Sequence, residues 1–187
     1  MLAAARECIA EHGLGATSLT DVAERAGVGR TTAYRAFAGK QDLLDALIRD
    51  DFARFFAEIA PTLEPSGPIR DQFTGAVRFA LGWYRDHEAL QQILQTEPEL
   101  LASTVINQSP DGTMLHLVSR GVAALLVQHP DAEQLAVEPA IAAEWMTRAM
   151  FSLFLVPGTL LGEDDSELAE RFTDLVLSGV WLESNDQ

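Results

Sequence analysis

The stretch TSLTDVAERAGVGRTTAYRAFAGKQDLLDALI, residues 17–48, decides the fold class of the N-terminal part of this chain. Ser18 followed by Asp21 has the pattern of a capping box, with Asp in the Glu position, and predicts that a helix begins there. Apolar residues at positions 19, 22, 23 and 26 follow at helical spacing and form one face. Gly27 can adopt the positive φ of a tight turn, after which a second short helix is expected over 30–37. Two short helices joined by such a turn predict a helix-turn-helix.

The charge of this stretch differs from that of the whole chain. The 187 residues carry a formal net charge of −15, yet residues 27–40 contain Arg30, Arg35 and Lys40 and no carboxylate. Residues 1–54 hold seven Lys and Arg against eight Asp and Glu, whereas residues 55–187 hold six against twenty. An acidic body repels a polyanion, so we expect any contact with nucleic acid to be confined to the N-terminal part. A solvated surface without a ligand is the alternative explanation for the same charges.

The second short helix has two distinct faces. At 100° per residue, Ala33 and Phe37 fall together and are expected to face inward. Thr31, Thr32 and Arg35 point the other way and would offer hydroxyls and a guanidinium to a DNA major groove. The flanking residues, together with Lys40 at the start of the next helix, would reach the phosphates.

The same 32 residues resemble the DNA-binding signature of TetR-family transcriptional regulators. The matching positions are Thr17, Val22-Ala23, Ala26-Gly27-Val28, Thr32, Tyr34, Phe37, Lys40 and Leu43-Leu44. Ala36 departs from a frequent histidine, Ala33 from a larger aliphatic residue, and Gly29 from a common serine cap. The family usually has a basic arm and a longer first helix, so this chain is expected to begin late. Together with the two helix faces, the resemblance predicts the DNA-contacting residues Ser18, Thr20, Gly29, Arg30, Thr31, Thr32, Tyr34, Arg35 and Lys40.

Helical periodicity continues along the rest of the chain, and no strand pattern or internal repeat is evident. We therefore predict an all-α fold of about nine or ten helices. Three prolines and a glycine at 61–68 interrupt the pattern. The predicted organisation is a DNA-binding domain at 1–50 and a ligand-binding and dimerisation domain at 51–187. The expected helices cover 2–12, 18–26, 30–37, 41–60, 69–86, 88–95, 98–106, 113–129, 139–156 and 166–183.

Apolar residues of the larger domain are candidates for an effector pocket, since the resemblance implies a small-molecule ligand there. Helical stripes of this kind ordinarily form the hydrophobic core, which is the alternative explanation for the same residues. TEPELL at 96–101 resembles QsdR-like regulators of lactone quorum-signal catabolism, which would make a lactone or an acyl-chain compound the ligand. The predicted pocket residues are Trp83, Leu90, Ile93, Leu94, Leu101, Met114, Leu117, Val118, Trp145, Met146 and Met150.

The last two predicted helices are candidates for a homodimer interface. The helix at 139–156 is apolar around most of its circumference and needs cover on two sides. The helix at 166–183 adds an apolar stripe that includes Gly179 and Val180. Two such helices from each chain would form a four-helix bundle, as the resemblance implies, although an intramolecular core would cover the same surfaces.

The sequence offers no motif of an enzyme or a cofactor site. It contains no Gly-rich phosphate loop, no nucleophile elbow and no metal-ligand spacing, so we predict no catalysis, no cofactor and no bound metal. No window is apolar enough for a membrane helix, and the single cysteine, Cys8, suits a reducing compartment, so we predict a cytoplasmic protein. The predicted function is a ligand-responsive repressor bound to double-stranded palindromic operator DNA. The alternative is a helical adaptor that binds other proteins, which would leave residues 27–40 without a role.

Overall fold

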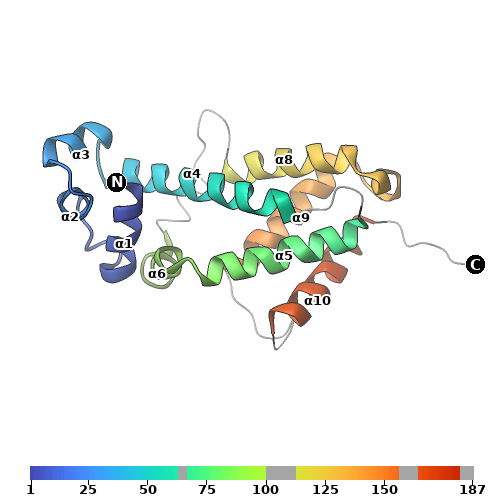
Figure 1. The fold of residues 1–187 in the computed structure, drawn as a ribbon. Coiled ribbons are helices and arrows are strands. Elements are labelled where there is room, and N and C mark those ends of the chain that lie inside the picture. The colour runs from blue at the N-terminus through green and yellow to red at the C-terminus, as the bar shows by residue number, and fades with distance from the viewer. Residues whose placement is uncertain (63–66, 100–112, 156–163, 182–187) are drawn as a thin grey trace, which may run out of the picture. The chain divides into compact units, whose positions relative to one another are not determined.

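The computed structural model describes residues 1–62, 67–99, 113–155 and 164–181 (Figure 1). Over these residues the chain forms nine α-helices and two short 3₁₀-helices with no β-strand, which confirms the predicted all-α fold. The predicted helix at 98–106 lies almost wholly outside the described residues. The α-helices are α1 (Leu2–His12), α2 (Leu19–Arg25), α3 (Arg30–Ala36), α4 (Lys40–Ile59), α5 (Ile69–Arg85), α6 (Glu88–Thr96), α8 (Met114–Gln128), α9 (Pro139–Leu155) and α10 (Asp165–Leu177).

Contacts divide the chain into two compact units, and the first of them contains the helix-turn-helix. This unit comprises residues 1–58 and 83–104, so α6 returns to the N-terminal helices although it follows α5 in the sequence. The helix α6 packs against α1, and α1 packs against α2 (Figure 1). The buried side chains at the centre of the unit include Ile9, Leu14, Val22, Leu43 and Leu44.

Polar contacts fix α1, α4 and the start of α6 to one another within the first unit. The guanidinium of Arg6 on α1 donates to the carboxylates of Asp50 and Asp51 on α4. The other oxygen of Asp51 lies 3.1 Å from His87 Nε2. His87 Nδ1 accepts the backbone N–H of Leu90 at 3.2 Å, and so caps the N-terminus of α6.

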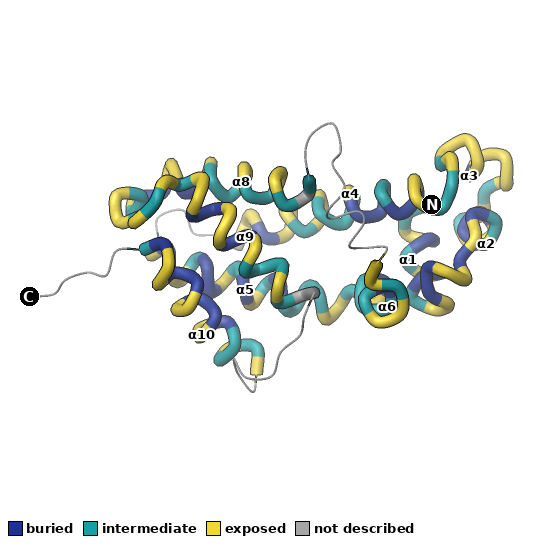
Figure 2. Tube along the Cα trace, turned by 180° about the vertical axis from the view of Figure 1, so that it is seen from behind, coloured by how far each residue is buried: buried dark blue, intermediate teal, exposed yellow. Residues whose placement is uncertain are grey.

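The second unit, residues 59–82 and 105–187, has its own hydrophobic core. The core joins α5, α8, α9 and α10, and the rings of Phe73 and Phe172 stack there with centroids 6.2 Å apart. The hydroxyls of Thr74 and Thr173 hydrogen-bond at 3.0 Å inside the same core. Figure 2 shows the buried faces of these helices as dark segments along each tube.

The last helix is shorter than the sequence predicted. It ends at Leu177, so Gly179 and Val180 lie beyond it rather than on its apolar stripe. Tertiary contacts explain the end: Val180 O accepts the N–H of Ala136, and the indole N–H of Trp145 donates to Val176 O at 3.0 Å. The predicted placement of Gly179 on the apolar stripe of the last helix is therefore wrong.

Among the described residues, no helix is both long enough and apolar enough to cross a bilayer.

Candidate nucleic-acid interface

Local hydrogen bonds determine where the first helix of the predicted reading motif begins. Ser18 Oγ accepts the N–H of Asp21, and the Asp21 carboxylate accepts the Ser18 N–H at 2.8 Å and its hydroxyl at 2.7 Å. This reciprocal pair is the predicted capping box, and it is confirmed. The Ser18 hydrogen bonds hold the pKa of the Asp21 carboxyl below its ordinary value, because they stabilise its ionised form.

Gly27 makes the turn between α2 and α3. Its φ is +67°, a conformation in which a side chain would be strained, and a Cβ there would meet nothing within 4 Å. Gly29 then caps α3 with extended backbone and no side chain. The glycine at 27 is therefore required by backbone conformation rather than by close packing.

The helix α3 presents its polar side chains outward. Ala33 is fully buried, whereas Thr31, Thr32 and Arg35 are exposed, as the helix faces predicted, and Tyr34 is 57% exposed. In Figure 2 the tube of α3 is mostly yellow, the colour of exposed residues. An exposed helix with hydroxyls and a guanidinium on its outer face can enter a major groove.

The cations around α3 differ in how strongly they are held. Arg30 donates to Glu24 at 3.0 Å, in a pair whose two side chains are both mostly exposed, so solvent screens it. Arg25 instead donates to Glu7 and Glu11 of α1, and these carboxylates raise its pKa. Arg25 therefore joins α2 to α1.

The remaining predicted DNA-contacting residues lie at the edges of the motif. Ser18 is exposed, Thr20 is half-buried, and Lys40 at the start of α4 is half-buried. Lys40 Nζ donates to Gly15 O at 2.7 Å. An ammonium has three donors, so this bond leaves two that could reach a phosphate. That these side chains contact DNA stays a prediction.

The predicted effector-binding residues are distributed over both units. In the first unit, the Trp83 ring contacts Phe55 edge-on at 5.4 Å, Ile93 is buried, and Leu90 and Leu94 are half-buried. Leu101 and the side chain of Met114 lie outside the described residues. In the second unit the side chains range from the core to the surface: Met146 is buried, Met150 and Val118 are half-buried, and Leu117 and Trp145 are exposed. That they line one pocket stays a prediction.

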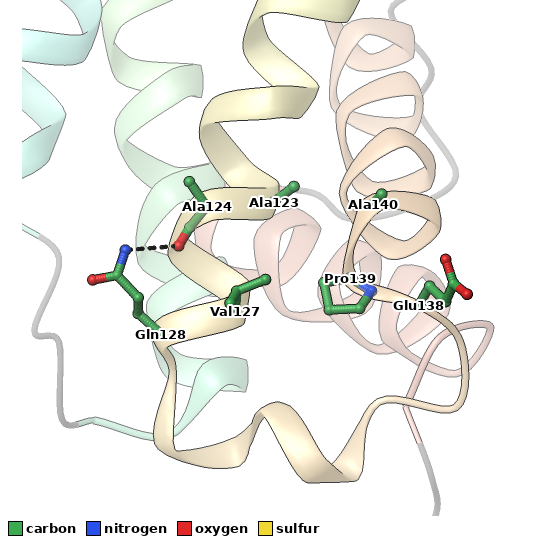
Figure 3. Close-up of a pocket in the computed structure, with 7 residues that line it drawn as sticks. All are labelled: Ala123, Ala124, Val127, Gln128, Glu138, Pro139 and Ala140. Atoms are coloured by element: carbon green, nitrogen blue, oxygen red, sulfur yellow. Dashed lines mark hydrogen bonds between the residues drawn. The ribbon is translucent and has the colours of Figure 1, made fainter.

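A surface groove of about 510 Å³ lies at other residues of the second unit (Figure 3). Its walls come from the C-terminal half of α8 and the first residues of α9, and they are mostly apolar. No sequence pattern predicts this groove, because alanines at helical spacing give no sign of a concave surface. The lining residues are Ala123, Ala124, Val127, Gln128, Glu138, Pro139 and Ala140.

Comparison with known proteins places this motif in a family. Residues 1–47 match the family of bacterial regulatory proteins described as tetR. The HTH-type transcriptional repressor KstR2 of Mycobacterium tuberculosis is 29% identical over 103 residues, which are 55% of this chain and 52% of KstR2. The chain thus matches about half the length of this curated relative.

Solved structures resemble the fold over nearly the whole chain. The repressor AlkX from Dietzia sp. has a TM-score of 0.66 at 19% identity, with 96% of this chain and 94% of AlkX covered. The R. erythropolis repressor QsdR has a TM-score of 0.63 at 20% identity, with 100% of this chain and 95% of QsdR covered. At such identities the likeness extends to the fold alone. Residues 1–47 therefore have the N-terminal helix-turn-helix of the TetR family of bacterial regulatory proteins.

Proposed function

We propose that this chain is a cytoplasmic transcriptional repressor that binds a palindromic operator as a homodimer and is released by a small, largely apolar effector. The helix α3 would lie in the major groove, with Arg35 and the threonines toward base edges. Lys40 and Tyr34 would contact phosphates. The repressors among the relatives and the match to the family's N-terminal domain support this proposal.

The single observation that carries the proposal is the exposed, acid-free face of α3. Residues 26–41 contain no carboxylate in a chain of net charge −15, and Thr31, Thr32 and Arg35 are all exposed there. A polyanion would meet repulsion from most of an acidic surface but not from this segment. Glu24 is the nearest acid before it, and its carboxylate accepts a hydrogen bond from Arg30 in an exposed pair.

The effector is proposed to be apolar on the character of the candidate residues. Val118, Met146 and Met150 of the second unit offer aliphatic groups and thioethers rather than charges, which suits a lactone or an acyl-chain compound. The descriptions of two similar proteins mention largely apolar compounds. KstR2 is described as a ketosteroid regulator, and AlkX is implicated in the biodegradation of n-alkanes.

The homodimer is proposed to form through α9 and α10. Ile141 and Trp145 lie one turn apart on α9 and are 57% and 46% exposed, while Leu175 on α10 is 60% exposed. Trp145 donates to the carbonyl of Val176, the residue after Leu175, so α9 and the end of α10 meet at this point. Exposed apolar side chains gathered in this way favour a protein partner.

The experiment that tests DNA binding selects an operator from random duplexes and titrates it by fluorescence anisotropy at several salt concentrations. Arg35→Ala should lose about 1–3 kcal/mol of specific binding and relax one base preference. Lys40→Ala should weaken binding to all duplexes alike and reduce the salt slope by about one ion.

The control is Arg120→Ala, which removes an exposed cation of α8 in the second unit, outside α3 and the helices of the proposed interface. It should bind the operator as the wild type does. If the wild type selects no duplex, or if Arg35→Ala and Arg120→Ala behave alike, α3 is not the reading helix.

A further inference from the structure

The end of α6 carries a carboxylate that contacts the N-terminal helices. Glu97 follows the last residue of α6 and caps it, with its N–H donating to Ile93 O. Its Oε1 accepts the backbone N–H of Gly15 at 2.5 Å, across 82 positions of sequence. Gly15 lies in the turn that joins α1 to α2, so this contact ties the end of α6 to the entrance of the helix-turn-helix.

The absence of a side chain at Gly15 leaves room for this carboxylate. A Cβ on Gly15 would lie 3.0 Å from Glu97 Oε1 and 3.2 Å from Oε2, closer than side chains normally approach. Gly13 has a φ of +80°, and its missing Cβ faces Gln92, Thr96 and Glu97 at 3.7 to 3.9 Å. The last turn of α6 therefore lies across two glycines, and a side chain at position 15 would press on the carboxylate.

The carbonyl of Gly15, in the next peptide of the same turn, contacts Lys40. Gly15 O accepts Lys40 Nζ at 2.7 Å, so Glu97 and Lys40 contact the two backbone polar groups of one residue. The hydroxyl of Thr17 fixes the turn from inside by donating to Gly13 O at 2.8 Å. Ser18, the first residue of the capping box, follows directly.

We propose that Glu97 is a positioning residue for the DNA-binding site, acting through Gly15 on Lys40. This proposal rests on the proposed function, because it assigns Lys40 to a phosphate. With the turn held by Glu97, the Gly15 carbonyl holds the ammonium in place before DNA arrives, and binding needs less ordering of a long side chain. Without Glu97 the turn and Lys40 must be ordered when DNA binds.

The sign of the effect separates positioning from simple charge. Glu97 is an acid, so its loss should strengthen DNA binding if only the overall field matters. Positioning predicts the opposite result. Glu99, an exposed acid two residues further along, supplies the matched control because Glu99→Ala makes the same change in net charge.

The experiment measures affinity for the selected operator, at one salt concentration, for wild type, Glu97→Ala, Glu97→Gln, Glu99→Ala, Lys40→Ala and the double variant Glu97→Ala/Lys40→Ala. Glu97→Ala should bind about three- to tenfold more weakly than Glu99→Ala, as expected for loss of a charge-assisted hydrogen bond. Glu97→Gln keeps an acceptor oxygen and should recover most of the affinity. In the Lys40→Ala background the further loss from Glu97→Ala should be under about twofold, because the two residues act on one contact.

Two results would overturn the proposal: equal affinities for Glu97→Ala and Glu99→Ala, or the same fold loss from Glu97→Ala with and without Lys40. The second result would indicate a purely structural role. Failure of the proposed function gives a different pattern, since the wild type would then select no duplex. In that case the amide resonance of Gly15 still reports on the contact, and an unchanged position in Glu97→Ala would show that the carboxylate does not hold the turn.

Discussion

Ser18 and Asp21 show how two side chains three residues apart determine where a helix begins. Both hydrogen bonds of the box span three residues, so the sequence alone predicts them. The Glu97–Gly15 contact spans 82 positions, and no local pattern reveals it. The sequence shows Glu97 only as an acid beside Pro98, a pattern that favours a solvated helix start. Residues with local partners are therefore predictable here, whereas the residue that joins two distant segments is not.

The capping box should make stability depend on pH. Because the pKa of Asp21 is lower in the folded chain than in the unfolded chain, its contribution is fully present above the unfolded value of about 3.9. That contribution is lost as the pH falls through the folded value. Asp21→Asn should therefore lower the melting temperature at neutral pH and show a smaller further decrease than the wild type between about pH 5 and pH 3. Equal pH profiles for the wild type and Asp21→Asn would contradict this role for the box.

At the scale of elements, the sequence predicted most helices within one or two residues. The start of α9 at Pro139 and the extent of α5 follow from local signals, namely a first-turn proline and helical periodicity. The end of α10 does not, because Leu177 is followed by a turn that depends on Ala136 and Trp145 from distant segments. Helical periodicity past Leu177 is real in the sequence, yet tertiary hydrogen bonds redirect the chain.

The aromatic residues at the end of α4 have unequal roles. Phe55 is half-buried and contacts Trp83 edge-on at 5.4 Å, whereas Phe56 is 40% exposed. Phe55→Ala should therefore lower the free energy of unfolding by about 1–3 kcal/mol, and Phe56→Ala by less than about 1 kcal/mol. Urea titration followed by circular dichroism measures both. A greater loss for Phe56→Ala would mean that its contact with the Phe55 ring, at 5.6 Å, contributes more than the contact with Trp83.

At the scale of the whole molecule, a single boundary near residue 50 does not describe how the chain is packed. Contacts assign residues 83–104 to the N-terminal unit, so the chain leaves that unit and returns to it. A composition change at 61–68 marks the departure, but no comparable signal marks the return. Sequence patterns detect linkers, whereas the return of α6 depends on packing against α1.

The proposed assembly gives the last prediction. Leu175 on α10 and Leu125 on α8 are each 60% exposed, so they form a matched pair on different helices of the second unit. If α9 and α10 form the interface, Leu175→Glu places a carboxylate in a desolvated contact at a cost of several kcal/mol, whereas Leu125→Glu leaves its charge in water. Light scattering over a concentration series should then show Leu175→Glu as a monomer and Leu125→Glu as a dimer. The monomer should also bind a palindromic operator much more weakly, because two half-sites require two linked reading helices. A monomeric Leu125→Glu beside a dimeric Leu175→Glu would instead move the interface to α8, next to the groove at Val127.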